Sequence, residues 1–402
     1  MPATVASDYV YLDWAATAPL GAEAAEAMAP YGVPGPANLV VGGNANSLHA
    51  PGRAAFAALE DARRSIARDL GASRPDEIIF TSGATEADDA ALFGIAQAAL
   101  EERRQHGSGD FVPHVITTAV EHDAVLAPAK RLEAQGFRVT RLAPNRQGFV
   151  EVAALEATLD TDTVLVSVQA ANSEVGSIQP IAELARVAHG VGALFHTDAV
   201  QALGKVPLNL RELDVDAASF SAHKVGGPKG VGALYLKART PFRAYLLGGG
   251  QESGRRSGTQ NVCGAVGFAA ACHAACALQK DEAVRLAKLR DKLYAGLSAH
   301  GAVEATVNVP AGSEDFLPNI VHVLVDGFES ETLILRFDMR GFGVSGGSAC
   351  SSHSLEPSHV LHALGIDDDR AQGALRLSMG RYTTEHDVDA FLGAVAGVLD
   401  WS

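Results

Sequence analysis

One lysine of this chain stands in a glycine-rich turn directly after an apolar run. Residues 220–232 read FSAHKVGGPKGVG, which places Ser221 and His223 beside Lys224. Lysine side chains usually lie in solvent, whereas glycines let a backbone approach a bound group closely. Desolvation and neighbouring positive charge lower the pKa of a lysine and free its amine to bond a carbonyl as an imine. Lys224 is therefore a candidate for holding a carbonyl cofactor.

Polar residues also follow four other predicted strands, at the point where each strand ends. They are Thr85 after the strand at 77–80, His122 after 115–118, Asn172 after 164–168 and Asp198 after 193–196. Alone, each could be an ordinary helix cap or, for His122, a structural histidine. Because α/β folds bind ligands at the carboxyl edge of the sheet, five convergent strand ends favour one shared site.

The segment Ser82-Gly-Ala-Thr85 lies between a predicted strand and a predicted helix. Free N–H groups and the helix dipole favour an anion there. No G-x-x-x-x-G-K-[ST] pattern occurs, so a nucleotide-binding P-loop is not predicted. A carboxylate at Asp198 could keep a pyridine nitrogen protonated, which makes pyridoxal phosphate an electron sink. Lys224, Asp198 and this anion site together point to pyridoxal 5'-phosphate.

Two residues of the C-terminal third could handle a substrate. Arg376 lies in the strand pattern ALRLS, where a planar guanidinium suits a carboxylate and a surface ion pair is the alternative. Cys350 lies in SGGSACSS, among small polar residues, which indicates an exposed and nucleophilic thiol. Cys272 and Cys276 share one face of an alanine-rich helix, so we expect buried small residues there and predict no metal site.

Charge and composition exclude several classes of function. Lysine and arginine total 32 against 47 aspartate and glutamate, a formal charge of −15, whereas a nucleic-acid or anionic-membrane surface would be basic. The N-terminus lacks a signal pattern, and we expect no apolar run long enough to span a membrane. Four cysteines do not form a disulfide framework. We therefore expect a cytoplasmic protein that binds neither nucleic acid directly nor membrane.

The elements that must position these residues alternate over residues 50–260. The strands, which include 217–220 and 233–236, are short and apolar on both faces, as in a sheet covered on both sides. Helical patterns separate several of them, at 54–70, 87–100, 124–135, 153–159 and 181–191. This alternation predicts a layered α/β domain with a mostly parallel sheet.

After about residue 262 the pattern changes to that of a smaller α+β domain. A long helix at 264–298 leads to strands near 304–309, 320–325 and 374–378 and to a final helix. We predict three units along the chain. They are an N-terminal segment, 1–20, packed with the small domain; a large cofactor-binding α/β domain, 21–261; and the small domain, 262–402, which carries the Cys350 loop.

Ten motifs spread along nearly the whole chain resemble those of cysteine desulfurases, in the class V aminotransferase superfamily. They are YLDWAATAP, TSGATEADD, TAVEHDAV, ANSEVG, HTDAVQALGK, SAHKVGGPKGVG, RRSGTQN, SGGSACSS, LEPSHVL and LRLSMGRYTT. The resemblance implies the type I fold of pyridoxal-phosphate-dependent transferases, with a mostly parallel seven-stranded sheet in its large domain. One departure is Asp13-Trp14, where an Asp-Asn pair is more usual.

The resemblance also implies a role for each residue of the site. Lys224 forms the Schiff base, Asp198 pairs with the pyridinium nitrogen, and His122 stacks on the ring. Gln201 bonds the ring hydroxyl. The phosphate ligands are Ala84, Thr85, Ser221 and His223, with Thr259 reaching in from the second subunit of a homodimer. Arg376 holds the substrate carboxylate together with Asn172, which also contacts the cofactor.

The implied catalytic residues are Lys224, His122 and Cys350. Sulfur would leave L-cysteine as a persulfide on Cys350, giving L-alanine, and pass to an acceptor protein for iron–sulfur cluster assembly or thiolation. A selenocysteine lyase or another enzyme of the superfamily, such as an aminotransferase, is the nearest alternative. A catalytically silent relative would lack Lys224, Asp198 or Cys350, and this chain has all three.

Overall fold

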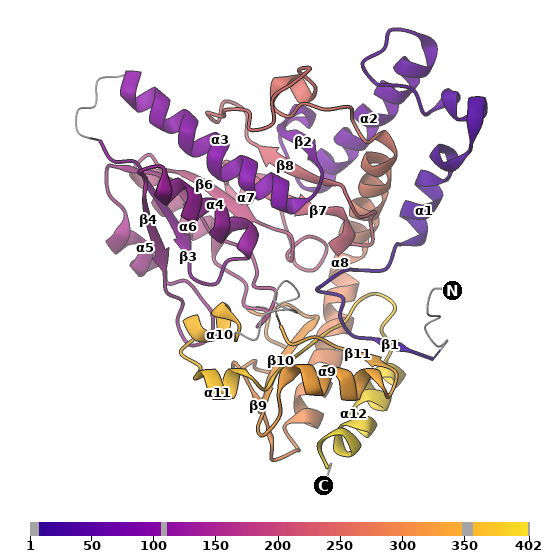
Figure 1. Ribbon diagram of the computed structural model, residues 1–402, viewed down its shortest axis with the longest axis vertical. Helices are drawn as coiled ribbons and strands as arrows, with labels where there is room; N and C mark the ends of the chain where they lie inside the picture. The colour runs from indigo at the N-terminus through magenta and orange to yellow at the C-terminus, as the bar shows by residue number, and fades with distance from the viewer. Residues whose placement is uncertain (1–7, 106–110, 348–356, 401–402) are drawn as a thin grey trace.

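The computed structural model describes residues 8–105, 111–347 and 357–400. Its elements gather around two sheets, a large one in the upper part of Figure 1 and a small one in the lower part. The helix α8 runs between the two parts. The site described below lies where the two parts meet.

The large sheet has seven strands in the order β2-β8-β7-β6-β5-β3-β4. Only β8 runs against its neighbours, and every other pair in the sheet is parallel. The strands are β2 (Ile78–Thr81), β3 (His114–Thr118), β4 (Arg138–Leu142), β5 (Thr163–Ser167), β6 (Leu194–Asp198), β7 (Ala217–Ser221) and β8 (Gly232–Leu236). The predicted fold class, a mostly parallel seven-stranded α/β sheet, is confirmed.

Helices cover both faces of this sheet, which explains why its inner strands are apolar on both sides. One hydrophobic core packs α2, α6 and the first part of α8 on one face. Another packs α3 and α4 on the opposite face. The helices of this part are α1 (Ala22–Met28), α2 (Ala50–Asp69), α3 (Ala84–Gln105), α4 (Asp123–Ala134), α5 (Val152–Thr158), α6 (Ile181–Gly190) and α7 (Leu210–Leu213).

Strand β4, which the sequence analysis did not predict, forms one edge of the sheet. It reads RVTRL, and Arg138 and Arg141 are exposed. An edge strand pairs on one side only and often carries charged residues, so it lacks the apolar run that marked the inner strands. Its absence from the prediction therefore has a physical cause.

The small part holds two further sheets. Strand β10 (Ile320–Val325) lies between β9 (Val303–Ala305) and β12 (Ala374–Ser378) in an antiparallel sheet. The N-terminal strand β1 (Val10–Tyr11) pairs in parallel with β11 (Phe342–Gly343). This pairing fixes the N-terminal segment against the small part. The helices here are α9 (Ser330–Asp338), α10 (His359–Ala363), α11 (Asp368–Ala371) and α12 (Glu385–Leu399).

Helix α8 (Val262–Leu297) contributes to the cores of both parts. Its first turns, up to Cys272, belong to the core under the large sheet, and Leu286–Leu297 belong to the core of the small part. Contrary to the sequence-based expectation, α8 is long and apolar enough by composition to cross a membrane. Its packing against α1, α2 and α12 is that of a core helix. The predicted division of the chain at residue 262 stays a prediction.

Trp14, the departure noted in the sequence, fills a tight space against Gly380. A Cβ atom at Gly380 would lie 2.1 Å from the Trp14 ring. The ring also lies 5.8 Å from that of Tyr382, and the indole N–H donates to the Tyr11 carbonyl at 3.1 Å. The tryptophan therefore joins the N-terminal segment to the end of β12.

We expect Gly380→Ala to destabilise the fold by about 1–3 kcal/mol, because the added methyl group overpacks the Trp14 ring. The measurement is urea denaturation of the purified protein. Gly393→Ala is the matched control, since Gly393 is exposed on α12 and an added Cβ meets nothing within 4 Å. Equal stability of the two variants would contradict the packing described here.

Candidate active site

A cavity of about 600 Å³ opens at the carboxyl edge of the large sheet. The loops after β2, β3, β5, β6 and β7 all reach it, because these strands run in the same direction. Nine of the predicted site residues line it, namely Ala84, Thr85, His122, Asp198, Gln201, Ser221, His223, Lys224 and Arg376. The structure thus brings together residues from five strand ends and from the small sheet.

Lys224 follows β7 in a short 3-10 turn and is held by the N-terminal segment. Its Nζ donates to the main-chain carbonyls of Ala15 at 2.6 Å and Ala16 at 2.9 Å. The following glycines permit this arrangement. Gly226 has a φ of +83° and its carbonyl accepts from Gly21 N at 2.8 Å, so the turn fits closely against residues near the N-terminus.

Asp198 ends β6 and is buried. One of its oxygens accepts from Val200 N at 2.9 Å. Burial raises the pKa of the Asp198 carboxyl, while the Val200 hydrogen bond and the positive charges of His122 and Lys224 oppose that rise. A cation placed against Asp198 would favour its ionised form further.

Gln201 follows three residues after Asp198, and only the nitrogen of its side-chain amide has a hydrogen-bond partner among the described residues. Its Nε2 donates to the Ala15 carbonyl at 3.0 Å. Its Oε1 is buried and has no hydrogen-bond partner among the described residues. Because a buried acceptor without a partner is costly, this atom indicates a place for a donor from a bound group.

The opposite end of the cavity suits an anion. Ala84 and Thr85 open α3, where the first N–H groups have no partner within the helix. Gly232 of β8 allows the loop to pack there, since a Cβ on it would lie 2.7 Å from the carbonyl carbon of Gly83. Ser82 N donates to Glu86 at 2.7 Å, and Glu86 is paired with Arg256, which fixes the loop.

Two further predicted phosphate ligands lie beside this helix start. Ser221 ends β7 and is buried. His223 Nδ1 lies 3.2 Å from the hydroxyl of Thr17. Burial, followed by the charges of Lys224, Lys229 and Lys205, lowers the pKa of His223 to about 4. His223 is therefore neutral near pH 7 and can serve as a hydrogen-bonding group.

His122 is both a helix cap and a residue of the cavity wall. It is the N-cap of α4, and its Nδ1 accepts from Ala124 N at 3.1 Å. It also lines the cavity and lies close enough to Asp198 to act on its carboxyl electrostatically. Capping therefore fixes the imidazole at the site without excluding the predicted catalytic role.

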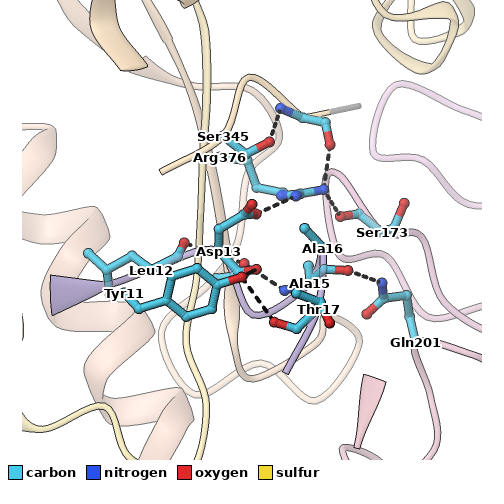
Figure 2. A network of polar contacts seen from close by, with 12 residues as sticks. Tyr11, Leu12, Asp13, Ala15, Ala16, Thr17, Ser173, Gln201, Ser345 and Arg376 are labelled. Carbon is cyan, nitrogen blue, oxygen red and sulfur yellow. Dashed lines mark hydrogen bonds and ion pairs between the residues drawn. The ribbon is translucent and has the colours of Figure 1, made fainter. Parts of the chain in front are cut away.

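Arg376 projects from β12 of the small sheet and is 2% exposed. Figure 2 shows its guanidinium between Asp13 and Ser173. Nη2 donates to Asp13 at 2.8 Å, and Nη1 donates to the carbonyls of Ser173 at 3.0 Å and of Gly347. Nε is buried without a hydrogen-bond partner among the described residues. The guanidinium thus keeps a donor for a ligand and is not the surface ion pair considered as the alternative.

Two of the predicted residues that the structure describes, Asn172 and Thr259, do not line the cavity. Asn172 lies beside it, but its Oδ1 accepts from Glu174 N and Val175 N, both at 2.9 Å, and its Nδ2 donates to Val120 O at 3.1 Å. Its predicted contacts with substrate and cofactor stay a prediction. Thr259 is exposed, as a residue that serves a second subunit would be, and that role is untested.

Cys350 lies outside the described residues, so the structure does not place its thiol. The residues that flank its segment are placed. Gly347 on one side and His359 on the other both line the cavity that Lys224 lines. Ser358 donates to Glu174 at 2.6 Å, and the His359 Nε2 lies 2.8 Å from the Glu121 carbonyl oxygen.

Sequence reasoning missed the part played by the N-terminal segment. Asp13 pairs with Arg376, and the carbonyls of Ala15 and Ala16 receive Lys224. Main-chain carbonyls leave no trace in residue type. Asp13 did carry a signal, because it stands alone in the YLDWAATAP motif as a charged side chain.

A second missed feature is a buried carboxyl group at Glu121. Its Oε1 accepts from Thr118 at 2.7 Å and from Gln169 N at 2.9 Å, and its Oε2 has no partner among the described residues. Burial raises the pKa of Glu121 to about 8, and the charge of Asp198 adds to the rise. Glu121 is therefore largely protonated at neutral pH.

Comparisons with known proteins agree with this geometry. A family described as Aminotransferase class-V matches residues 10–391. A cysteine desulfurase IscS of Dictyoglomus turgidum is 41% identical over 391 residues, covering 97% of this chain and 94% of the relative. A solved "NIFS-like protein" has 39% identity and a TM-score of 0.87, covering 97% of this chain and 99% of its own. A structure of SspA in complex with cysteine has 29% identity and a TM-score of 0.76, covering 93% of this chain and 100% of its own.

The chain therefore belongs to the class V aminotransferase family and, within it, to the cysteine desulfurases. The cofactor of this family is pyridoxal 5'-phosphate, and the residues of the cavity fit it. They supply an amine at Lys224, a buried carboxyl at Asp198 and a helix N-terminus at Ala84 and Thr85. They also supply an acceptor on Gln201 that has no partner in the described part of the chain.

The buried carboxyl of Glu121 makes the free energy of unfolding decrease as the pH rises. Its pKa is about 8 in the folded protein, against about 4.3 when unfolded, so between these values only the unfolded chain loses the proton. The contribution of Glu121 to stability is fully present at low pH and is lost as the pH rises, by about 1.4 kcal/mol per unit between pH 5.5 and 7. We expect Glu121→Gln, which cannot ionise, to lose this part of the slope in urea denaturation. Parallel pH profiles for wild type and variant would contradict the assignment.

Proposed function

We propose that this chain removes sulfur from L-cysteine, releasing L-alanine and leaving a persulfide on Cys350. The observation that carries this proposal is the shared cavity. It joins the amine of Lys224, the carboxylate of Asp198 and the guanidinium of Arg376 with both flanks of the Cys350 segment. The relatives named cysteine desulfurase and the SspA complex with cysteine support the same substrate.

Arg376 binds the carboxylate of the substrate. Its Nε donor is buried and has no partner within residues 8–105, 111–347 and 357–400, and a guanidinium recognises a carboxylate through two parallel hydrogen bonds. Asp13 and the Ser173 carbonyl hold the guanidinium plane in place, so little rotamer freedom is lost on binding. These contacts set the end of the cavity at which the substrate carboxylate lies.

Pyridoxal phosphate, when bound, supplies the electron sink that weakens the bonds at the substrate's α-carbon. Lys224 would bond its carbonyl group, and Asp198 would hold a proton at its ring nitrogen. Ala84, Thr85, Ser221 and His223 would hold its phosphate, and Gln201 would accept from its hydroxyl. The amine of Lys224 would also take and return a proton at the substrate's α-carbon.

Cys350 acts as the nucleophile toward the substrate sulfur. Its thiolate forms an S–S bond while the substrate C–S bond breaks, and the electron pair of that bond remains with the carbon fragment. Protonation of this fragment yields L-alanine. His122 caps α4 at the cavity wall and is placed to exchange a proton during these steps.

The direct test is incubation of the holoenzyme with L-cysteine and a reducing thiol. Alanine and sulfide should appear in equal amounts, and Cys350→Ser should lose this turnover by at least about a hundredfold, because the nucleophile is gone. Cys263→Ser is the control, since Cys263 is a free cysteine that does not line the cavity, and it should keep wild-type rates.

Retention of full turnover by Cys350→Ser would refute the persulfide step. Lys224→Ala should lose the visible absorbance of the lysine-bound cofactor as well as turnover. A covalent cofactor that persisted in Lys224→Ala would refute the role given to that lysine.

We also propose a homodimer in which a second copy covers one apolar surface. This surface carries exposed side chains from two segments, Leu39, Val40, Leu48 and Phe56 from the first and Tyr245, Leu246 and Leu247 from the second. Asn46 Nδ2 donates to Gln260 at 3.1 Å, and Ser257 N donates to the Leu246 carbonyl at 3.1 Å, so the two segments adjoin Thr259. Large contiguous apolar patches mark protein interfaces.

Complementation between subunits tests this arrangement. Lys224→Ala and Thr259→Ala homodimers should each be impaired, and a mixed dimer should regain activity because one site contains both intact residues. Mixed dimers are prepared by denaturing and refolding the two variants together. Activity no greater than the sum of the parents, or a monomer in light scattering at working concentration, would contradict the proposal.

A cytoplasmic location and a protein acceptor complete the proposal. The described cysteines are free thiols, and a reducing compartment also keeps Cys350 reactive. The acceptor takes the outer sulfur of the persulfide for iron–sulfur cluster assembly or thiolation. Transfer of labelled sulfur from the loaded enzyme to cytoplasmic proteins identifies it.

A further inference from the structure

A second, smaller cavity lies behind Lys224, on the side away from the large one. Its volume is about 90 Å³. The residues that line it include Trp14, Lys205, Lys224, Glu282, Asn319 and Arg381. The function proposed above uses Lys224 but none of the other five residues.

The main chain at Lys205 is fixed between the loop after β6 and helix α8. Lys205 N donates to Ala202 O at 3.0 Å, and its carbonyl accepts from Gln279 Nε2 of α8 at 3.1 Å. Gly204 has a φ of +69°, and a Cβ on it would lie 2.6 Å from the methyl group of Ala275. This close approach leaves the Lys205 side chain at the cavity wall.

Two polar atoms at this cavity lack partners among the described residues. Lys205 Nζ is buried without an acceptor, and Asn319 Oδ1 is buried without a donor. Asn319 is 1% exposed, and its Nδ2 donates to the Met379 carbonyl at 3.2 Å. Since a water molecule occupies roughly 30 Å³, the cavity has room for about three, which would satisfy both atoms.

The charges around Lys205 are mostly positive. Burial, and then the charge of Lys224, lowers the pKa of Lys205 to about 7. His223 responds to the charge of Lys205 as well as to that of Lys224. The cations that face this region are Lys224, Lys229 and Arg381, and the acidic groups are Asp198 and Glu282. The imidazoles of His223 and His122 face it as well. Arg381 is already paired with Glu23 at 2.8 Å.

We propose that Lys205 is a positioning residue for Lys224. Its ammonium group, solvated by water in the small cavity, disfavours positive charge on the neighbouring amine. Lys224 then stays available to bond the cofactor and to accept a proton, as a lysine beside another cation does. The inference rests on the cofactor-binding role given to Lys224 and adds a residue that touches neither substrate nor cofactor.

The test compares holoenzymes of wild type, Lys205→Met and Lys205→Arg. Methionine keeps an unbranched apolar stem and removes the charge, whereas arginine keeps the charge. The visible absorbance of the cofactor bound to Lys224 is recorded against pH. In Lys205→Met we expect its midpoint to rise by about one pH unit, and in Lys205→Arg to stay within a few tenths of a unit of wild type. For alanine formation near neutral pH, kcat should fall about tenfold in Lys205→Met while KM stays unchanged.

Two results would overturn the proposal. One is a wild-type midpoint in Lys205→Met, and the other is a shift in Lys205→Arg as large as that in Lys205→Met. The absorbance titration needs bound cofactor but no sulfur release, so its outcome is separate from that of the desulfurase test.

A measurement on the unsubstituted holoenzyme covers the case in which Lys205→Met does not fold. A crystal structure at a resolution that shows ordered water should contain water bridging Lys205 Nζ and Asn319 Oδ1. A dry cavity, or a direct protein partner for Lys205 Nζ, would refute the arrangement.

Discussion

The site depends on a short stretch of main chain, residues 13–17, which joins the large sheet to the small one. The carbonyl of Ala15 accepts from both Lys224 and Gln201, which belong to the large part of the molecule. Asp13, two residues earlier, pairs with Arg376 of the small sheet. Figure 2 shows the contact of Ala15 with Gln201 and that of Asp13 with Arg376. The cofactor end and the substrate end of the cavity are thus held by one segment, which contains a turn at residues 14–16 and follows the pairing of β1 with β11.

Electrostatics within the cavity follow from burial more than from the number of charges. Asp198 and Glu121 are both buried, and both carboxyl pKa values are raised. Only Asp198 has the positive charges of His122 and Lys224 nearby to favour ionisation. A bound pyridinium ring would add to that preference. The two carboxyl groups therefore differ in the groups that oppose the effect of burial on their pKa values.

The sequence predicts those parts of the fold and of the cavity wall that depend on patterns within a short stretch of the chain. The buried strands β5, β6 and β7 begin with mainly apolar residues, and polar residues of the site stand at or soon after their ends, such as Asp198 and Lys224. Strand direction alone then gathers these residues at one edge. Residue types and their order along the chain were sufficient for this part.

The remainder depends on contacts between distant segments. Strand β4 was not predicted, because an exposed edge strand does not need apolar residues on both faces. The main-chain acceptors of Lys224 could not be predicted from the sequence, because every residue has a carbonyl group. Asn172 has the residue type of a ligand, yet its amide is used to brace the turn that follows β5. Which hydrogen-bond partners these groups find depends on the packing of distant segments, and the neighbouring sequence does not determine it.

Because helix α8 belongs to two hydrophobic cores, it affects how the molecule unfolds. One continuous helix supplies side chains to the core beneath the large sheet and, 14 residues beyond Cys272, to the core of the small part from Leu286 onward. Loss of either core would leave half of this helix without its packing, and an isolated half would be marginal in water. The two cores are thus mechanically coupled, and heat or denaturant should melt them as a single cooperative unit.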